Sequence, residues 1–541
     1  MGETIRLEMN DALYNAGLLG FMKVCRYGGL PFDTDRTGIS FSTDIFSDFG
    51  SCYLETLIDC YRDDMIFTEI IRRFHALPSQ LTDESQKQAS NHIKYILDKL
   101  LRASYKSAYE IIKKSGDHYP FAEQISMIKK AECYESQLNL LSGLIEKLKE
   151  HEDVFLLKDI AYTRLQPFWS NVSFLNKTKN TDDFLASYEE TFSAPAFTFI
   201  PKEASSAKLS CCQCHNGLKA SDALSMSWIN DLGVDMKRKT SYYWNLNPDT
   251  WLCPVCNLVY SCIPLGFIIK GTEAIFVNKN NSLQELEQTM AHLKVLNPDQ
   301  NASNLYYQIL NEFIALEMQS SAEHETANVQ VVRHSNGHYY YNILSKEKLQ
   351  VILNGKACLE RLEKIYYTID NTTFNLYQET IHRILTGVSL YPFISRLAFD
   401  GIKNNRSIGF IMNLVQLQVL QSNPSGKGAG KMSDKTYLYI ALSGDTLRKA
   451  MLSNERNEKK IASLTFQLLN SLKNKNPNKF SDILLRQYMS MNMDVPFFMT
   501  EIFTDENTFL SKGYSFIAGL NGCIYTKKQE DTTAVYKEAN S

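Results

Sequence analysis

The spacing of apolar and polar residues predicts that the chain begins with a strand and a buried helix. Apolar and polar residues alternate from Ile5 to Met9, as in a strand with one buried face. The next segment, Leu13 to Phe21, is apolar on most sides and predicts a buried helix. A second strand is expected at Gly38 to Phe41, followed by a helix over residues 45–61. Charged amphipathic segments then predict long helices over residues 84–152.

Strand patterns return in the middle of the chain. Short strands are expected at Ala196 to Ile200 and, as a pair, at Leu258 to Ile263 and Phe267 to Val277. Both residues of Asn336-Gly337 tolerate positive φ, so a hairpin is predicted over residues 329–343. Beyond about residue 346 the pattern is almost entirely helical, and the expected core residues are Leu447, Met451, Ile461, Leu464, Leu468 and Leu472.

Length and composition are those of an ordinary globular protein with several domains. The chain has 541 residues, 44% of them hydrophobic and 22% charged. This length predicts roughly two to four domains. No run of residues reaches the roughly 18 consecutive apolar residues of a membrane span. The N-terminus carries Glu3, Arg6, Glu8 and Asp11 before its first apolar run, whereas a secretory signal has a basic start and a longer apolar block. We therefore expect a cytoplasmic protein that does not bind membranes.

The net charge of −3 hides a basic segment. Residues 401–490 hold 14 Lys or Arg and 5 Asp or Glu, a balance of +9. Residues 1–400 hold 39 and 48, a balance of −9. A basic segment inside a mildly acidic chain predicts a local surface for a polyanion such as nucleic acid. A solvated helix face with spare lysines has the same composition, so both interpretations stay open at this point.

Four of the twelve cysteines have the spacing of a metal site. They form two C-x-x-C pairs separated by 38 residues, namely Cys211, Cys214, Cys253 and Cys256. Zinc prefers a tetrahedron of soft ligands, and a two-residue spacer lets both sulfurs of a pair face one ion. A closed set of this kind predicts one structural zinc ion. Cys212, His215 or Cys262 lies close enough in sequence to replace one ligand, whereas a redox pair is disfavoured because the pairs do not lie in a strand–helix context.

These patterns together predict an α+β protein. A mixed N-terminal domain would carry a zinc-knuckle insertion and would be followed by a mainly α-helical C-terminal bundle. The expected parts are an N-terminal α+β domain, the zinc-knuckle insertion, the β-rich remainder of the N-terminal domain and the helical bundle, over residues 1–200, 201–265, 266–345 and 346–541.

The sequence favours binding over catalysis. It contains no His-Asp doublet of the kind that holds a nuclease metal, and Ser425 to Met432 departs from a phosphate-binding loop at its first and last positions. His334 and His338 flank the predicted hairpin turn, and we expect them to be exposed rather than metal ligands. We therefore predict that the chain has no catalytic residues.

Several motifs together resemble one family of proteins. Residues Leu13 to Phe21 are similar to the opening of the large subunits of type I-B CRISPR effector (Cascade) complexes. The two C-x-x-C pairs resemble the feature that defines the C-x-x-C–C-x-x-C branch of those subunits. Four C-terminal segments resemble the closing helical region of this branch: Gly444 to Arg448, Leu468 to Asn470, Phe480 to Leu485 and Phe516 to Leu520. The likeness extends from about residue 10 to residue 520.

The resemblance implies a role in antiviral defence. Such a subunit belongs to a crRNA-guided surveillance complex, binds double-stranded target DNA and the displaced strand, and recognises the protospacer-adjacent motif. Its partners would be crRNA, the backbone and crRNA-end-capping subunits, and a separate helicase–nuclease that it helps to recruit. A zinc-ribbon-bearing nucleic-acid enzyme, RNA-modifying or a nuclease, and an architectural assembly factor are the alternatives.

Three groups of residues are candidates for contacts with nucleic acid. A polar segment after Trp169 would approach DNA near the adjacent motif, through Asn171, Asn176, Lys177 and Lys179. Three cations lie beside the aromatic residues 242–244 in the segment between the cysteine pairs, namely Lys237, Arg238 and Lys239. A basic turn before a buried aromatic strand has the same pattern. The C-terminal candidates are Lys403, Arg406, Arg448, Lys449, Lys473, Lys475 and Lys479.

Overall fold

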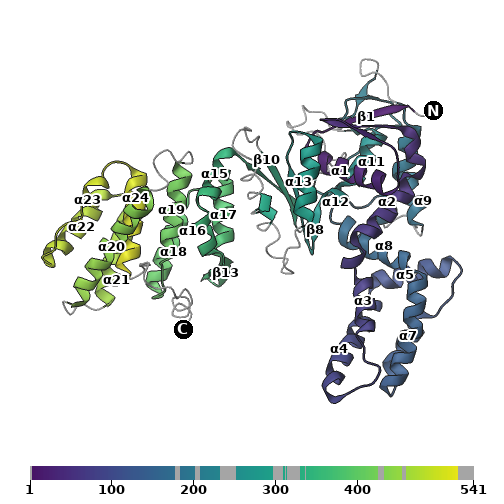
Figure 1. Ribbon diagram of the computed structural model, residues 1–541, viewed down its shortest axis with the longest axis horizontal. Helices are drawn as coiled ribbons and strands as arrows, with labels where there is room; N and C mark the ends of the chain where they lie inside the picture. The colour runs from purple at the N-terminus through teal and green to yellow at the C-terminus, as the bar shows by residue number, and fades with distance from the viewer. Residues whose placement is uncertain are drawn as a thin grey trace. The chain divides into compact units, whose positions relative to one another are not determined.

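The protein is represented by a computed structural model (Figure 1) that describes residues 3–176, 183–200, 207–231, 251–295, 309–310, 312–313, 329–335, 337–423, 432–453 and 458–521. The chain divides into two compact units. The first comprises Met1–Phe313 and Val329–Tyr341, and the second comprises Ile314–Asn328 and Asn342–Ser541. Helices and separate antiparallel sheets occur together, so the predicted α+β class is confirmed. The division into four parts stays a prediction.

The first unit combines small sheets with helices. Its main helices are α1 (Ala12–Tyr27), α2 (Phe46–Tyr61), α3 (Ile66–His75), α4 (Asp83–Leu100), α5 (Ala103–Lys114), α6 (Phe121–Lys130), α7 (Tyr134–Glu150), α8 (Glu152–Ile160), α9 (Phe184–Tyr188), α10 (Ala194–Thr198), α11 (Pro254–Ser261), α12 (Ile263–Gly266) and α13 (Leu283–Val295). One sheet has the order β1-β3-β2, formed by Thr4–Glu8, Gly38–Ser42 and Asp33–Thr34. A four-stranded sheet has the order β11-β10-β9-β8, formed by His338–Leu344, Val329–Ser335, Glu273–Asn278 and Ile268–Lys270. The end of β11, from Asn342, is assigned to the second unit.

Helix α1 lies at the centre of the first unit. Twelve of its residues are buried because its apolar series is almost continuous around the helix. It packs directly on α11 and α12, and glycines allow the close approach. A Cβ on Gly20 would lie 2.1 Å from the carbonyl oxygen of Cys262, and one on Gly17 would lie 2.5 Å from that of Val259. The two glycines of the N-terminal motif therefore let α1 contact the backbone of the helices that follow the second cysteine pair.

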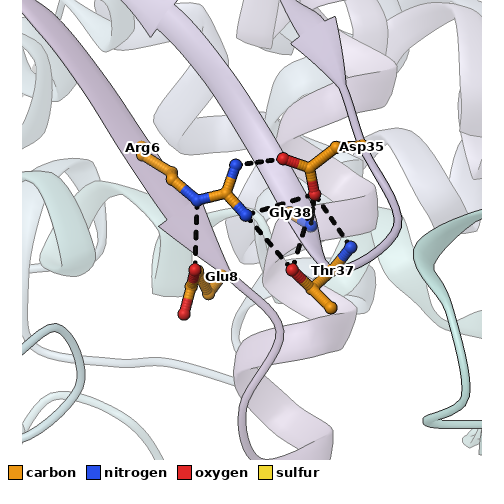
Figure 2. Close-up of polar contacts among 5 residues, drawn as sticks. All are labelled: Arg6, Glu8, Asp35, Thr37 and Gly38. Atoms are coloured by element: carbon orange, nitrogen blue, oxygen red, sulfur yellow. Dashed lines mark hydrogen bonds and ion pairs between the residues drawn. The ribbon is translucent and has the colours of Figure 1, made fainter.

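The three-stranded sheet is closed at one end by a polar cluster (Figure 2). Strands β1 and β3 pair with Arg6 opposite Ser40. The Asp35 carboxylate, in the β2–β3 turn, accepts hydrogen bonds from the backbone N–H groups of Thr37 (2.9 Å) and Gly38 (3.0 Å). Arg6 donates to the same carboxylate, which lowers the pKa of Asp35. These exposed contacts hold the turn in register, although exposed ion pairs stabilise a fold only weakly.

Helices α3–α8, residues 66–160, form the helical lobe of the first unit (Figure 1). The Asp159 carboxyl group lies inside the lobe, where it is only 2% exposed. It accepts hydrogen bonds from the backbone N–H of Phe67 (3.0 Å) and from the hydroxyl of Tyr105 (3.1 Å). Burial raises the pKa of Asp159 to about 6, because the charged form loses its hydration. Asp159 thus connects α3, α5 and α8. The free energy of burying its carboxyl group depends on whether that group is ionised.

We predict that this group makes the helical lobe less stable as the pH rises from 4 to 7. A carboxyl group with a raised pKa in the folded state stabilises the fold fully below its unfolded pKa. That contribution is lost as the pH passes through about 6. The change attributable to Asp159 is about 3 kcal/mol. Urea unfolding of the wild-type protein and of Asp159→Asn across this pH range would measure it: the difference between the two should change with pH, and parallel curves would contradict the prediction.

The second unit is mainly helical, as predicted. Its helices are α15 (Lys346–Asn354), α16 (Lys356–Leu362), α17 (Leu376–Thr386), α18 (Tyr391–Lys403), α19 (Ile411–Ser422), α20 (Met432–Ser453), α21 (Glu458–Lys473), α22 (Pro477–Ser490), α23 (Phe498–Glu501) and α24 (Glu506–Leu520). All six residues of the predicted apolar series are buried. Helices α20 and α24 pack closely because Gly519 approaches Ala441, where a Cβ would lie 1.8 Å from the carbonyl oxygen.

Of three strand predictions in the first unit, the structure contradicts two and confirms one. The expected strand at Ala196 to Ile200 is wrong, since Ala194–Thr198 forms α10. The expected strand at Leu258 to Ile263 is also wrong, because these residues belong to α11 and α12. A continuous apolar run cannot by itself distinguish a buried helix from a buried strand. The segment Phe267 to Val277 does form strands, as the β8–β9 hairpin.

A hairpin in the second unit was not expected from the sequence. Strands β12 (Tyr366–Ile369) and β13 (Thr372–Asn375) pair antiparallel inside the mainly helical region. Asp370 and Asn371 form the turn, with φ of 51° and 63°. Positive φ at both central residues is the geometry of a tight hairpin turn, and Asp and Asn tolerate it better than most residues. The dipeptide Asp370-Asn371 is therefore the sequence feature from which this hairpin could have been predicted.

Candidate metal centre

The first cysteine pair lies in a short hairpin. Strands β4 (Leu209–Ser210) and β5 (Gly217–Leu218) pair antiparallel, and the turn between them carries both cysteines. The Cys211 N–H donates to the carbonyl of Asn216 (2.9 Å), and the His215 N–H donates to the carbonyl of Cys211 (3.0 Å). These bonds fold the turn tightly, so that the side chains of Cys211 and Cys214 approach each other.

The second cysteine pair lies at the N-terminus of α11. Cys253 is the N-cap, and its Sγ accepts a hydrogen bond from the N–H of Cys256 (3.3 Å). Pro254 occupies the first helical position, where its missing N–H costs nothing. An N–H donor at the positive end of the helix dipole therefore faces the Cys253 sulfur, and this contact stabilises a thiolate there. Strand β7 (Trp251–Leu252) precedes this pair, and its Trp251 carbonyl accepts from the Cys212 N–H (2.9 Å), which joins the two pairs.

The four sulfur atoms form a compact group. All of them lie within 4.8 Å of one another, and the Sγ atoms of Cys214 and Cys253 are 3.6 Å apart. A zinc ion with four bonds of about 2.3 Å to sulfur requires sulfur–sulfur separations of about 3.8 Å. Cys211, Cys253 and Cys256 are buried and Cys214 is half-buried. The donor set therefore fits one tetrahedral ion such as zinc, closed to substrate.

The electrostatics of the group also favour a cation. Hydrogen bonds from Cys214, Cys253 and Cys256 lower the pKa of Cys211, because they stabilise its thiolate. The interaction with Cys211 in turn raises the pKa of Cys256 well above the ordinary value of a thiol. Four thiolates so close together repel one another unless a positive ion lies between them. Bound zinc would supply that charge and keep all four sulfurs deprotonated.

The three alternative ligands lie outside this group. Cys212 directs its sulfur to Met226, at 3.8 Å. Cys262 is buried within α11–α12, with its thiol 3.5 Å from the carbonyl of Leu258. His215 is exposed and has a φ of 58°. The geometry thus brings together the four cysteines that the spacing predicts.

The start of α1 contacts both cysteine pairs. The Tyr14 hydroxyl lies 3.4 Å from the Sγ of Cys256, in a fully buried position. Asp11, the N-cap of α1, accepts a hydrogen bond from the hydroxyl of Tyr260 on α11 (3.2 Å). Gln213, between the cysteines of the first pair, donates to the same carboxylate. The N-terminal motif and the cysteine group are thus one structural element, which sequence analysis did not find because the residues lie far apart along the chain.

We predict that Tyr14→Phe weakens metal binding without unfolding the chain. When Cys256 is a thiolate, the tyrosine hydroxyl is the donor of their hydrogen bond, and phenylalanine fills the same space without it. Loss of a group that supports a metal ligand typically lowers affinity about 10–100-fold. Competition with a chromophoric zinc chelator would measure the change. Tyr53→Phe removes a buried hydroxyl that donates to the Ser261 carbonyl (2.9 Å) and not to a cysteine of the group, so its zinc affinity should stay at the wild-type value.

The comparison with known proteins bears on this same region. Residues 204–268 match the family of CRISPR-associated proteins described as Cas_CXXC_CXXC. The match covers both cysteine pairs. It supports a CRISPR-associated protein with a CXXC–CXXC motif, and with it a CRISPR-related role. No curated protein and no solved structure matches the chain.

The predicted contacts in the N-terminal half are only partly described. Asn171 is exposed, with a φ of 59°, and Asn176 follows a short 3-10 turn. Trp169 before them is buried. Lys177 and Lys179 lie outside the described residues. The three cations of the segment between the cysteine pairs, Lys237, Arg238 and Lys239, also lie outside them. Their contacts with nucleic acid stay predictions.

The C-terminal cations are placed on the surface of the second unit, with different surroundings. Arg448 is the least exposed, because it pairs with Glu458 and donates to the Leu520 carbonyl (3.3 Å). Its position therefore indicates a structural role. Three others form surface ion pairs: Arg406 with Asp400, Lys449 with Asp445 and Lys475 with Glu506. The remaining three, Lys403, Lys473 and Lys479, are exposed.

The two hairpin histidines differ from each other. His338 is exposed, as predicted, and its Nδ1 lies 3.2 Å from the Asp231 carboxylate. His334 is 2% exposed and stacks on Phe168, so the prediction that it is exposed is wrong. The cause is its strand: β10 lies between β9 and β11, and His334 faces the core.

In the described part of the chain, no helix is both long and apolar enough to cross a membrane.

Proposed function

We propose that the chain is the large subunit of a crRNA-guided type I-B CRISPR surveillance complex. In this role it binds target DNA, recognises the protospacer-adjacent motif and helps to recruit a separate helicase–nuclease. Its partners are crRNA, double-stranded target DNA, the displaced strand, and the backbone and crRNA-end-capping subunits.

The observation that carries the proposal is the union of two motifs in one structural element. The family match covers only the region of the cysteine pairs. The structure places the N-terminal motif directly on that region, through Tyr14, Asp11 and the glycine contacts. Two features on which the resemblance rests, far apart in sequence, are therefore parts of the same site. This union supports the type I-B assignment over a protein that carries an isolated zinc ribbon.

The cysteine group supports a structural role for zinc and a non-catalytic subunit. A closed tetrahedron of four thiolates leaves no position for a water or substrate, so an ion held there would not activate a nucleophile. We propose that cleavage is carried out by the separate helicase–nuclease. Recognition of the adjacent motif would come from protein contacts, whereas base pairing with the guide supplies the remaining specificity.

Reconstitution tests the proposal against the two alternatives. The chain is mixed with crRNA and the other complex subunits, and binding is measured on target duplexes with and without the adjacent motif. We expect motif-dependent binding that requires the chain, and no cleavage until the helicase–nuclease is added. Cleavage by the isolated chain would favour the enzyme alternative. Assembly without any effect on DNA binding would favour the architectural one.

The exposed C-terminal lysines lead to a further prediction. Charge reversal at Lys473, Lys475 and Lys479 should weaken binding to all target sequences alike, because phosphate contacts carry no direct sequence information. The dependence of affinity on salt should flatten by about 0.9 in the logarithmic slope for each phosphate that the variant no longer neutralises. Preference for the adjacent motif should survive. The measurement is fluorescence anisotropy of the assembled complex on labelled DNA at several salt concentrations.

A matched control lies in the same unit. Lys346, Lys356 and Lys364 are also exposed, so their reversal changes the net charge equally. If Lys473, Lys475 and Lys479 form a local phosphate-binding surface, their reversal should lower DNA affinity more than reversal of the control lysines. Equal effects from both sets would mean that these lysines act only through the overall charge of the unit. A binding defect limited to some target sequences would mean that they read bases.

A further inference from the structure

Two cations of the helical lobe lie against the same aromatic ring. The guanidinium carbon of Arg73, on α3, lies 4.0 Å from the centre of the Tyr95 ring. The Nζ atom of Lys99, on α4, lies 4.8 Å from the same centre. Arg102 follows within one turn as the N-cap of α5, and its N–H donates to the Lys99 carbonyl (3.0 Å). We call Arg73, Tyr95, Lys99 and Arg102 the Tyr95 cluster.

The ring gathers these charges without neutralising them. An aromatic face attracts a cation through its quadrupole, which is weaker than a full negative charge and leaves the cation able to bind an anion. Lys99 and Arg102 form no ion pair with the described residues. The Nε of Arg73 donates to Glu69 (2.6 Å), but its two terminal nitrogens bond to none of the described residues.

Lys99 and Arg102 differ from Arg73, which pairs with Glu69, and from other cations of the lobe that pair with a carboxylate. Arg72 pairs with Glu69 (2.6 Å), and Lys147 pairs with Glu150 (2.6 Å). The ordinary arrangement on this surface is thus a cation beside a carboxylate. In the Tyr95 cluster, partial burial and then the neighbouring charges of Arg102 and Arg73 lower the pKa of Lys99. The carboxyl groups of Asp159 and Asp98 offset part of this effect on Lys99. An anion that binds between the three cations would reduce the repulsion that remains.

We propose that Arg73, Lys99 and Arg102 bind phosphates of a nucleic-acid backbone, with Tyr95 holding Arg73 and Lys99 in place. The surface extends over α3, α4 and the start of α5, so it suits successive phosphates better than a single carboxylate. The inference deepens the proposed function, since it rests on nucleic-acid binding by this chain. Such contacts position a strand and do not select its sequence.

The test compares two sets of neutral substitutions in the full-length protein. The first set is R73Q, K99Q and R102Q, which removes the cations of the Tyr95 cluster. The control set is K113Q, K129Q and K130Q, at exposed positions of the same lobe, which removes equal charge. Affinity for a labelled DNA duplex is measured by fluorescence anisotropy at several salt concentrations. We expect the first set to weaken binding about tenfold at low salt and to flatten the logarithmic salt slope by about 2.7, which is about 0.9 for each of three phosphates. The control set should change both values much less.

Variants at Tyr95 provide a second readout that removes no charge. Tyr95→Phe keeps the ring and should bind DNA as the wild type does. Tyr95→Leu loses the ring and should bind more weakly, with circular dichroism confirming that the helices remain. Equal effects of the two triple sets, or displacement of the DNA by poly-glutamate at equal charge, would overturn the assignment of this surface to phosphates. If the wild-type protein itself failed to bind DNA alone or in the assembled complex, the proposed function would fail with it.

Discussion

Cys253→Ser is expected to release the metal ion and to unfold the region around it. Serine is a poor zinc ligand, so the closed tetrahedron loses one of its four bonds. Zinc content should fall from about one ion per chain to almost none. Because metal binding contributes directly to the folding of such sites, the first unit should lose at least about 3 kcal/mol of stability. Metal analysis of the purified protein and thermal unfolding would measure the two effects.

The position of Cys253 makes this substitution unusually informative. It is the N-cap of α11, and serine is among the best N-cap residues, so the start of the helix is preserved. Cys133 is the N-cap of α7, is exposed and is not part of the metal group. Cys133→Ser is therefore a matched control, and it should keep its zinc and gain up to about 1 kcal/mol.

A third serine variant distinguishes the ligand sets. Cys212 lies beside the first pair, but the structure directs its sulfur to Met226. Cys212→Ser should keep the zinc, whereas Cys211→Ser should lose it. Full zinc retention in both Cys211→Ser and Cys253→Ser would refute the site.

The cysteine group could be predicted from sequence because the spacing of the ligands within each pair is a local feature of the chain. A two-residue spacer fixes the geometry of each pair, and the number of ligands then requires the pairs to meet. The contacts that support the group could not be predicted in this way. Tyr14 reaches Cys256 only because α1 packs on α11, and nothing in the spacing of the chain indicates that packing. Long-range juxtaposition of this kind depends on tertiary structure.

The same distinction explains which elements were predicted. Alternating β1 and the long amphipathic helices each expose one face, so their periodicity is visible in the sequence. Residues 254–266 are buried on all sides, so α11 and α12 show an apolar run without a period. The Tyr95 cluster was missed for a further reason: Arg73 and Lys99 belong to different helices, and only their packing brings them to one ring.

Gly20→Ala is expected to destabilise the first unit although alanine is the better helix former. A Cβ at this position would lie 2.1 Å from the Cys262 carbonyl oxygen, a backbone atom that cannot move aside alone. Helix α1 would have to separate from α12, which opens the core and pulls Tyr14 away from Cys256. Overpacking of this kind costs about 1–3 kcal/mol or more. Chemical unfolding and zinc content should therefore both report the change.

The same substitution at Gly143 provides the control. Gly143 lies in α7 and is exposed, and a Cβ there would meet nothing within 4 Å beyond its chain neighbours and the backbone of its own helix. Alanine there should stabilise the helix by up to about 1 kcal/mol, since glycine is a poor helix former. Opposite signs for Gly20→Ala and Gly143→Ala would show that close packing, and not helix propensity, decides the effect at Gly20. A loss of zinc in Gly20→Ala alone would connect that packing to the metal site, whereas a stable, zinc-bound Gly20→Ala would mean that α1 does not support the cysteine group.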